Sequence, residues 1–237
     1  MDLRWIGAVP HGFSARVGRF HDRYPWVGPL LFVSSALYFY AQIATAWVFG
    51  PPSYSLVTNT ISDLGNTACG RYDNAYVCSP RHTLMNVSFI FLGVVMVAGS
   101  ALLYQEFTAQ RRERVAGLLG FGLMALAGLG AILVGAFPEN TSGALHITGA
   151  GLAIGAGNLG IFVLGALLSL PEAMRRYMLL FSVTSLTALV LFAAHRYFGI
   201  GAGTMERIAA YPETIWLISF GLFIWRFHPK DRRATAA

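Results

Sequence analysis

Charged side chains are scarce in this chain. Asp, Glu, Lys and Arg make up 12% of its 237 residues, whereas about 25% is usual for a soluble domain. Hydrophobic residues make up 55%, and the mean hydropathy is +0.56. Long apolar segments recur along the sequence, and about 20 apolar residues suffice to cross a bilayer as a helix. The shortage of charge therefore excludes a water-soluble globular fold and predicts an all-α, polytopic membrane protein.

Other features are missing as well, and the first two of these absences each remove a class of function. The formal net charge is +6, but the basic residues stand between the hydrophobic segments rather than along one face, so nucleic-acid binding is excluded. The glycines lie inside apolar segments, and the sequence contains no glycine-rich phosphate-binding loop. No two histidines stand at metal-binding spacing on one predicted helix.

What the sequence does contain is six apolar segments, which predict a bundle of six transmembrane helices. Their ranges are 26–49, 80–104, 116–137, 143–168, 178–195 and 212–227. Pro212 is interpreted as the first residue of the last helix, since proline favours that position. Residues 26–227 then form one transmembrane domain. A basic tail or interfacial helix precedes it at 1–25, and a basic tail follows at 228–237.

The basic residues also predict the orientation in the membrane. Of the 17 Lys and Arg residues, 13 fall on the side of the two tails and 4 on the opposite side. Cytoplasmic segments carry the excess of Lys and Arg in membrane proteins. Both termini are therefore expected in the cytoplasm, and the long loop 50–81 between the first two helices is expected outside.

Only two cysteines are present, and both fall in this long loop. An exterior location is oxidising enough to permit a disulfide between Cys69 and Cys78. We predict a bond that closes the loop and has no chemical role, in preference to a redox or metal site.

Polar residues gather at the predicted exterior ends of the helices. The densest cluster is 59–66 in the long loop, which includes Ser62 and Asp63. Ionisable groups at membrane depth usually face a cavity or one another, which predicts a shared exterior pocket. The candidate ligand-binding residues are Ser62, Asp63, His82, Asn86, Glu139, His146, His195, Arg196, Glu206 and Arg207, with Arg81 and Glu213 at the same level. The alternative is that helix ends simply tolerate such residues, because they reach water there.

The order of these motifs resembles a known family. Ser62-Asp63-Leu64-Gly65 after the first span, His82 at the start of the second, and His146 in the fourth are similar to the domain-of-unknown-function 998 membrane family. The resemblance covers roughly residues 26–227 and implies six helices in the plasma membrane of a prokaryote, with a distant likeness to the DRAM and Sfk-type proteins. It marks Ser62, Asp63, His82 and His146 as family-like polar positions and implies no reaction.

Two function classes follow from these residues. The first is a binding or structural membrane protein whose pocket holds a lipid headgroup or supports a membrane partner. The second is a metal-dependent hydrolase or transferase acting on a lipid, with zinc held by His82, His146 and His195 and with Asp63 as a ligand or general base. These four residues are the catalytic candidates, and their types are loosely similar to those of the alkaline-ceramidase superfamily.

A transporter is a third class. The sequence interpretation gives it less weight, because no charged residue is predicted at mid-membrane and no inverted repeat is evident. The 26 glycines, many inside predicted spans, would also permit a homo-oligomer through close helix contacts.

Overall fold

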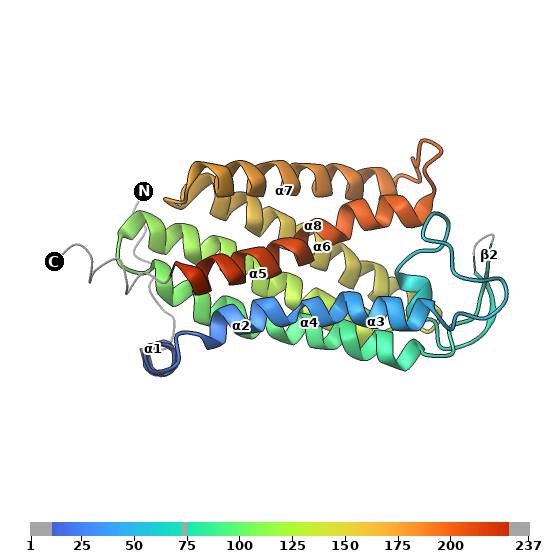
Figure 1. The fold of residues 1–237 in the computed structure, drawn as a ribbon, viewed down its shortest axis with the longest axis horizontal. Helices are drawn as coiled ribbons and strands as arrows, with labels where there is room; N and C mark the ends of the chain where they lie inside the picture. Colours follow the sequence, from blue (N-terminus) through green and yellow to red (C-terminus); the bar gives the residue numbers. More distant parts are fainter. Residues whose placement is uncertain (1–10, 73–74, 228–237) are drawn as a thin grey trace.

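Six long apolar helices form the body of the molecule. The computed structural model describes residues 11–72 and 75–227. The first span consists of α2 (Val27–Ser34) and α3 (Ala36–Ala46). The other five are α4 (His82–Leu103), α5 (Arg111–Ala136), α6 (Gly143–Leu167), α7 (Glu172–Ala193) and α8 (Ala202–Arg226). All six spans are long and apolar enough to cross a bilayer, which confirms the predicted all-α membrane bundle (Figure 1).

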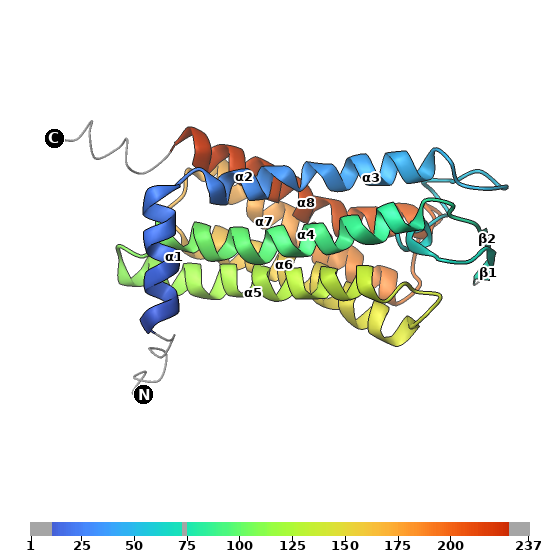
Figure 2. The same ribbon diagram turned by 90° about the horizontal axis from the view of Figure 1, so that it is seen from below.

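The first span is interrupted at Ser35. The hydroxyls of Ser34 and Ser35 donate to the carbonyls of Leu31 and Phe32, both at 2.6 Å. Such bonds compete with the backbone ladder of a helix and bend it. The chain nevertheless continues in nearly the same direction, so α2 and α3 act together as one membrane span (Figure 2).

The central helices pack at very short range. α5 lies between α4 and α6 and has its most extensive contacts with them. A Cβ atom on Gly130 of α5 would lie 2.6 Å from both the Gly149 carbonyl oxygen and the Ala153 amide nitrogen of α6. Small residues permit this close approach of two backbones in a membrane. Several glycines expected to favour an oligomer therefore serve packing within the chain, and the homo-oligomer itself stays a prediction.

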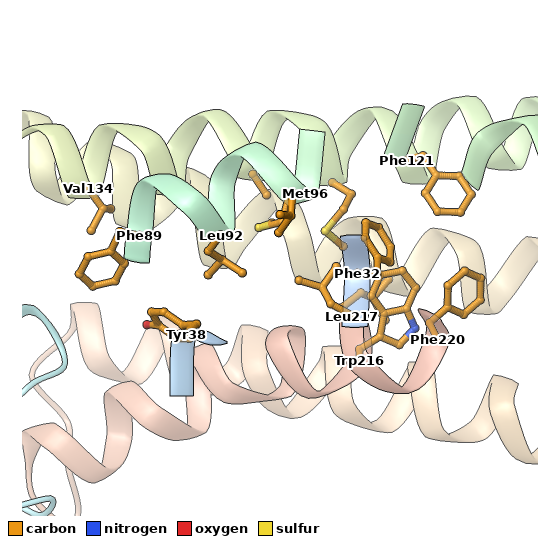
Figure 3. Close-up of a cluster of buried hydrophobic side chains, with 14 of the residues drawn as sticks. Phe32, Tyr38, Phe89, Leu92, Met96, Phe121, Val134, Trp216, Leu217 and Phe220 are labelled. Carbon is orange, nitrogen blue, oxygen red and sulfur yellow. The ribbon is translucent and has the colours of Figure 1, made fainter. Parts of the chain in front are cut away.

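The core between α2, α4, α5 and α8 is aromatic at one end. Trp216 stacks on Phe220 with their ring centroids 4.8 Å apart, and Phe32 lies edge-on to Trp216 at 5.8 Å. Figure 3 shows this cluster at one end and Tyr38 beside Phe89 and Val134 at the other. Buried rings therefore lie in both halves of the bundle, with a stacked cluster at one end and the Tyr38–Phe89 pair toward the other.

A further helix lies across one end of the bundle. This helix, α1 (His11–Arg23), runs crosswise to the membrane spans near the end of α4 (Figure 2). His21 Nε2 lies 3.0 Å from Glu106 Oε1, and both side chains are buried. The crosswise direction of α1 suits a helix that lies in the membrane interface. That location stays a prediction. Parts of the two predicted tails, 1–10 and 228–237, lie outside the described residues.

Three helices begin earlier than the sequence predicts. The predicted starts at 116 and 178 were late, because α5 begins at Arg111 and α7 at Glu172; polar first turns extend these helices beyond their apolar segments. The third difference concerns α8, which begins at Ala202 and contains Pro212 in its interior. Membrane helices tolerate an internal proline where neighbouring groups satisfy the backbone. The hydroxyl of Ser185 on α7 donates to the Ala209 carbonyl, which is next to the Ile208 carbonyl that loses its helical donor at Pro212.

The long loop 47–81 carries a small hairpin at the other end of the bundle. Strands β1 (Gly70–Tyr72) and β2 (Ala75–Val77) pair antiparallel. Cys69 and Cys78, which flank the hairpin, are joined as a disulfide. The predicted loop-closing bond is thus present.

The orientation prediction can be tested on intact cells. The long loop lies at the opposite end of the bundle from α1 and the C-terminal end of α8 (Figures 1 and 2). In a background with Cys69→Ala and Cys78→Ala, we expect Ser53→Cys to react with a membrane-impermeant maleimide, because Ser53 is exposed in the loop. Arg112→Cys, exposed at the other end, should be protected until the membrane is permeabilised. The reverse labelling pattern would show that the termini face outward.

Candidate functional site

An arginine fastens the long loop to the start of α8. The guanidinium of Arg207 donates to the carbonyls of Leu56, Asn59 and Gly203 at 3.0, 2.9 and 2.7 Å. It also donates to the Tyr54 hydroxyl, which in turn donates to the Thr60 carbonyl at 2.7 Å. Burial raises the pKa of the Tyr54 phenol, more than the nearby Arg207 lowers it. Arg207 is thus occupied with holding the loop in place.

Asp63 has a similar structural task within the loop. It begins a short 3₁₀ helix, Ser62–Gly65, together with Ser62. Its Oδ2 accepts from the Asn59 amide at 2.8 Å and from the Thr60 backbone N–H at 3.1 Å. The carboxylate therefore caps the turn that precedes the 3₁₀ helix, which fixes the direction of the neighbouring Ser62 side chain.

The end of the 3₁₀ helix is anchored to α4. The Asn86 amide donates to the Gly65 carbonyl at 2.9 Å, and Ser79 donates to the Leu64 carbonyl at 2.7 Å. A Cβ on residue 65 would lie 2.5 Å from Asn86 Oδ1, so a larger residue there would displace the Asn86 side chain. Asn86, predicted as a ligand-binding residue, holds the loop in this structure.

The centre of the site is a chain of three side chains from distant parts of the sequence. Ser62 Oγ lies 2.9 Å from His146 Nε2 and 3.2 Å from Glu206 Oε1. His146 Nδ1 lies 3.0 Å from the Phe137 carbonyl oxygen. The other oxygen of Glu206 accepts from the Ile61 backbone N–H. His146 and Glu206 are both buried. A backbone group orients the side chain at each end of this hydrogen-bonded chain of three residues.

The positions of the hydrogen atoms in this hydrogen-bonded chain of three side chains follow from counting donors and acceptors. The Phe137 carbonyl can only accept, so His146 Nδ1 carries a hydrogen. Ser62 has one hydroxyl hydrogen, which it gives either to Nε2 or to Glu206. When Ser62 donates to Glu206, its contact with His146 needs a hydrogen on Nε2, so the imidazole is doubly protonated. When Ser62 donates to Nε2, its contact with Glu206 needs a hydrogen on the carboxyl group, so the carboxyl is protonated.

These two arrangements contain the same number of protons. They differ only by the transfer of one proton between His146 and Glu206 through the Ser62 hydroxyl. The distance of 2.9 Å between His146 Nε2 and Ser62 Oγ lies within the ordinary hydrogen-bond range, and the distance of 3.2 Å between Ser62 Oγ and Glu206 Oε1 is slightly longer than the roughly 2.5–3.0 Å usual between two oxygens. The geometry therefore allows a proton to pass along the chain without movement of the backbone.

A cavity continues from this chain into the bundle. The space that water-sized molecules can occupy in it is about 60 Å³, enough for a few water molecules. Its polar lining comes from Ser62, Glu206, Glu213, Thr214 and Tyr38, and the rest is apolar. In Figure 3, Tyr38 faces Phe89 and Val134, which also line the cavity.

Several predicted site residues lie elsewhere. His82 is half-buried, and its Nδ1 lies 3.0 Å from the Ser79 carbonyl oxygen at the start of α4. His195 and Arg196 are exposed beyond the end of α7, where His195 contacts the Tyr197 hydroxyl at 2.9 Å. Glu139 is half-buried in the turn before α6. The structure thus brings together Ser62, His146 and Glu206 of the predicted set, while Asp63 and Arg207 hold the adjoining loop.

The predicted zinc arrangement is not found in the part of the chain that the structure describes. Within residues 11–72 and 75–227, no three His, Cys, Asp or Glu side chains lie close enough together to hold a metal ion. His195 in particular is separate, because it follows the last turn of α7 and points to a neighbouring tyrosine. The three-histidine ligand set was therefore wrong.

Glu213 is the residue that the sequence interpretation misplaced. With Pro212 as the start of the last helix, Glu213 was expected in a first turn near water. In the structure it is only 5% exposed and lies near the middle of α8. The spacing of seven residues between Glu206 and Glu213 could have shown this, because on one continuous helix it places both on the same face.

Comparison with known proteins adds one match. The family model described as "Protein of unknown function (DUF998)" matches residues 32–222, which is most of the chain. The chain belongs to the DUF998 family. The matched region includes Ser62, His146, Glu206 and Glu213, so the hydrogen-bonded chain and the cavity lie within the DUF998 domain. No match was found among curated proteins or among solved structures.

Proposed function

We propose that this multi-pass membrane protein translocates protons, with His146, Ser62 and Glu206 as the relay at the loop end of the bundle. The observation that carries the proposal is the hydrogen-bonded chain in which Ser62 bridges a histidine and a carboxyl. Proton relays in membrane proteins are built from such His, Glu and Asp side chains facing the bundle interior. Backbone groups of Phe137 and Ile61 hold both ends, which keeps the relay aligned.

The cavity supports a proton or water as the ligand. Its space of about 60 Å³ is far below the about 300–1,000 Å³ of pockets that hold drug-sized molecules. The predicted lipid headgroup would need a wider site than this. Water fits the volume and can link Glu206 to groups deeper in the bundle by hydrogen bonds.

Proton movement can be measured in proteoliposomes that contain a pH-sensitive dye, with the membrane potential clamped by potassium and valinomycin. We expect the protein to speed the equilibration of an imposed pH difference above the rate of protein-free liposomes. Ser62→Ala removes the bridging hydroxyl, and loss of a positioned proton-transfer group slows transfer by roughly a hundredfold. His146→Gln should have the same effect, since an amide cannot take up the proton.

The control is Ser53→Ala, because Ser53 is an exposed serine of the same loop that lines no part of the cavity. Its rate should equal that of the unsubstituted protein. Thermal unfolding in detergent shows whether each variant is folded. A rate no higher than that of empty liposomes, or an unchanged rate in folded Ser62→Ala, would contradict the proposal.

A second function is favoured by one observation, the 2.9 Å contact between Ser62 Oγ and His146 Nε2. In this contact a serine hydroxyl is hydrogen-bonded to one nitrogen of a histidine, and a hydrogen bond at the other nitrogen orients the ring. This is the arrangement of an acyl-transfer nucleophile and its base. The enzyme would act on a lipid without a metal. Covalent labelling of Ser62 by a fluorophosphonate probe, lost in His146→Gln, would favour this enzyme over the proton relay.

A further inference from the structure

Glu213 places a carboxyl group at the centre of the membrane span. It lies near the midpoint of α8 (Ala202–Arg226) and two helical turns, about 10 Å, beyond Glu206. Its side chain is 5% exposed. Its Oε1 has no hydrogen-bond partner among the described residues. An intramembrane carboxyl without a partner is costly to ionise and usually has a function.

The opposite helix leaves room for this group. Glu213 points at Gly157 of α6, where an added Cβ would overlap its Cδ and Oε1 atoms. The lining contributed by α4, α5 and α6 is apolar: Phe89, Leu92, Ala131, Val134, Ala150, Ala153 and Ile154. The titratable groups that share the cavity with Glu213 are Glu206 on the same helix and Tyr38 on α3.

We infer that Glu213 is a proton-binding site inside the bundle, reached from Glu206 through the cavity. An O–H bond forms on Glu213 as one breaks on a water molecule in the cavity, and that water is reprotonated from Glu206. No electron is transferred, and the charge on the carboxylate is lost when the proton arrives. This inference rests on the proposed function only for the route by which the proton reaches the cavity.

The protonation of Glu213 can be observed by infrared spectroscopy of the full chain in lipid nanodiscs at neutral pH. We expect a C=O stretching band of a protonated carboxylic acid in the unsubstituted protein. Glu213→Gln, which keeps the shape of the side chain, should remove the contribution of Glu213 to this band and leave that of a protonated Glu206. The same variant should slow proton flux in proteoliposomes roughly a hundredfold. An unchanged band in Glu213→Gln, or an unchanged flux, overturns the inference.

A second variant tests the site without changing the carboxyl. Gly157→Ala should displace Glu213 from its position and reduce the band and the flux together, because the new methyl group takes the space of the carboxyl. Gly151→Ala on the same helix is the control, since nothing lies within 4 Å of the added Cβ there, and it should leave both unchanged. Equal effects of the two glycine variants would contradict the site.

The two proposals fail in different ways. If flux is lost in Ser62→Ala but retained in Glu213→Gln, the relay stands and the inner site falls. If flux is lost in Glu213→Gln but retained in Ser62→Ala, the inner site stands and the proton reaches it by another path.

Discussion

Replacing Arg207 with methionine is expected to release the long loop from α8 and to destabilise the protein by about 3 kcal/mol. Arg207 satisfies three carbonyls and the Tyr54 hydroxyl. Methionine fills a similar volume but leaves the loop carbonyls of Leu56 and Asn59 without this donor, and each buried unsatisfied group costs roughly 1–3 kcal/mol, less where water can enter. The melting temperature in detergent, followed by circular dichroism, measures the loss.

The matched control is Arg196→Met. Arg196 is exposed at the same end of the bundle, so its replacement should change stability by no more than about 0.5 kcal/mol. Arg207→Lys should fall between the two, because an ammonium group lacks the planar fork that reaches several acceptors at once. Equal melting temperatures for Arg207→Met and Arg196→Met would show that the loop does not depend on the buried guanidinium.

Gly130→Leu is expected to have the largest effect on folding. At this position an added Cβ already lies 2.6 Å from backbone atoms of Gly149 and Ala153, and backbone cannot move aside as a flexible side chain can. Forcing α5 and α6 apart also affects the contacts of α5 with α4. Overpacking of one or two methylenes costs about 1–3 kcal/mol, so we expect a leucine to prevent accumulation of folded protein.

Gly122→Leu provides the comparison on the same helix. Gly122 is exposed, and nothing lies within 4 Å of its added Cβ, so the leucine enters the lipid phase. Folded yield, measured by size-exclusion chromatography of the detergent-solubilised protein, should be unchanged for this variant. Gly130→Ala gives a graded measurement, with a lowered melting temperature expected. A normal folded yield of Gly130→Leu would show that the two helices do not approach as closely as described.

The features that the sequence predicted correctly depend on local composition. Each span needs about 20 apolar residues, and this requirement is visible in any window of the chain, so six helices could be counted from hydropathy alone. The disulfide could be predicted because Cys69 and Cys78 are the only two cysteines and lie in one loop. The glycines inside the predicted spans indicated close helix contacts, and one such contact lies between Gly130 of α5 and Gly149 and Ala153 of α6.

Where each polar side chain points was decided by tertiary structure. Ser62 meets His146 across 84 residues of sequence and Glu206 across 144. Periodicity says nothing about such pairs, because it describes one helix at a time. His82 and His195 stand at helix ends as His146 does, yet only His146 is turned toward Ser62.

The position of Glu213 shows the same limit most clearly. A proline in a sequence favours a helix start, and by that local rule Glu213 belonged near water. In the bundle, α7 supplies a hydroxyl to the Ala209 carbonyl, α6 offers a glycine opposite the carboxyl, and α8 continues through Pro212. Apolar length determined that the chain crosses a membrane six times, whereas contacts between helices determined that a carboxyl group lies in the middle of the last crossing.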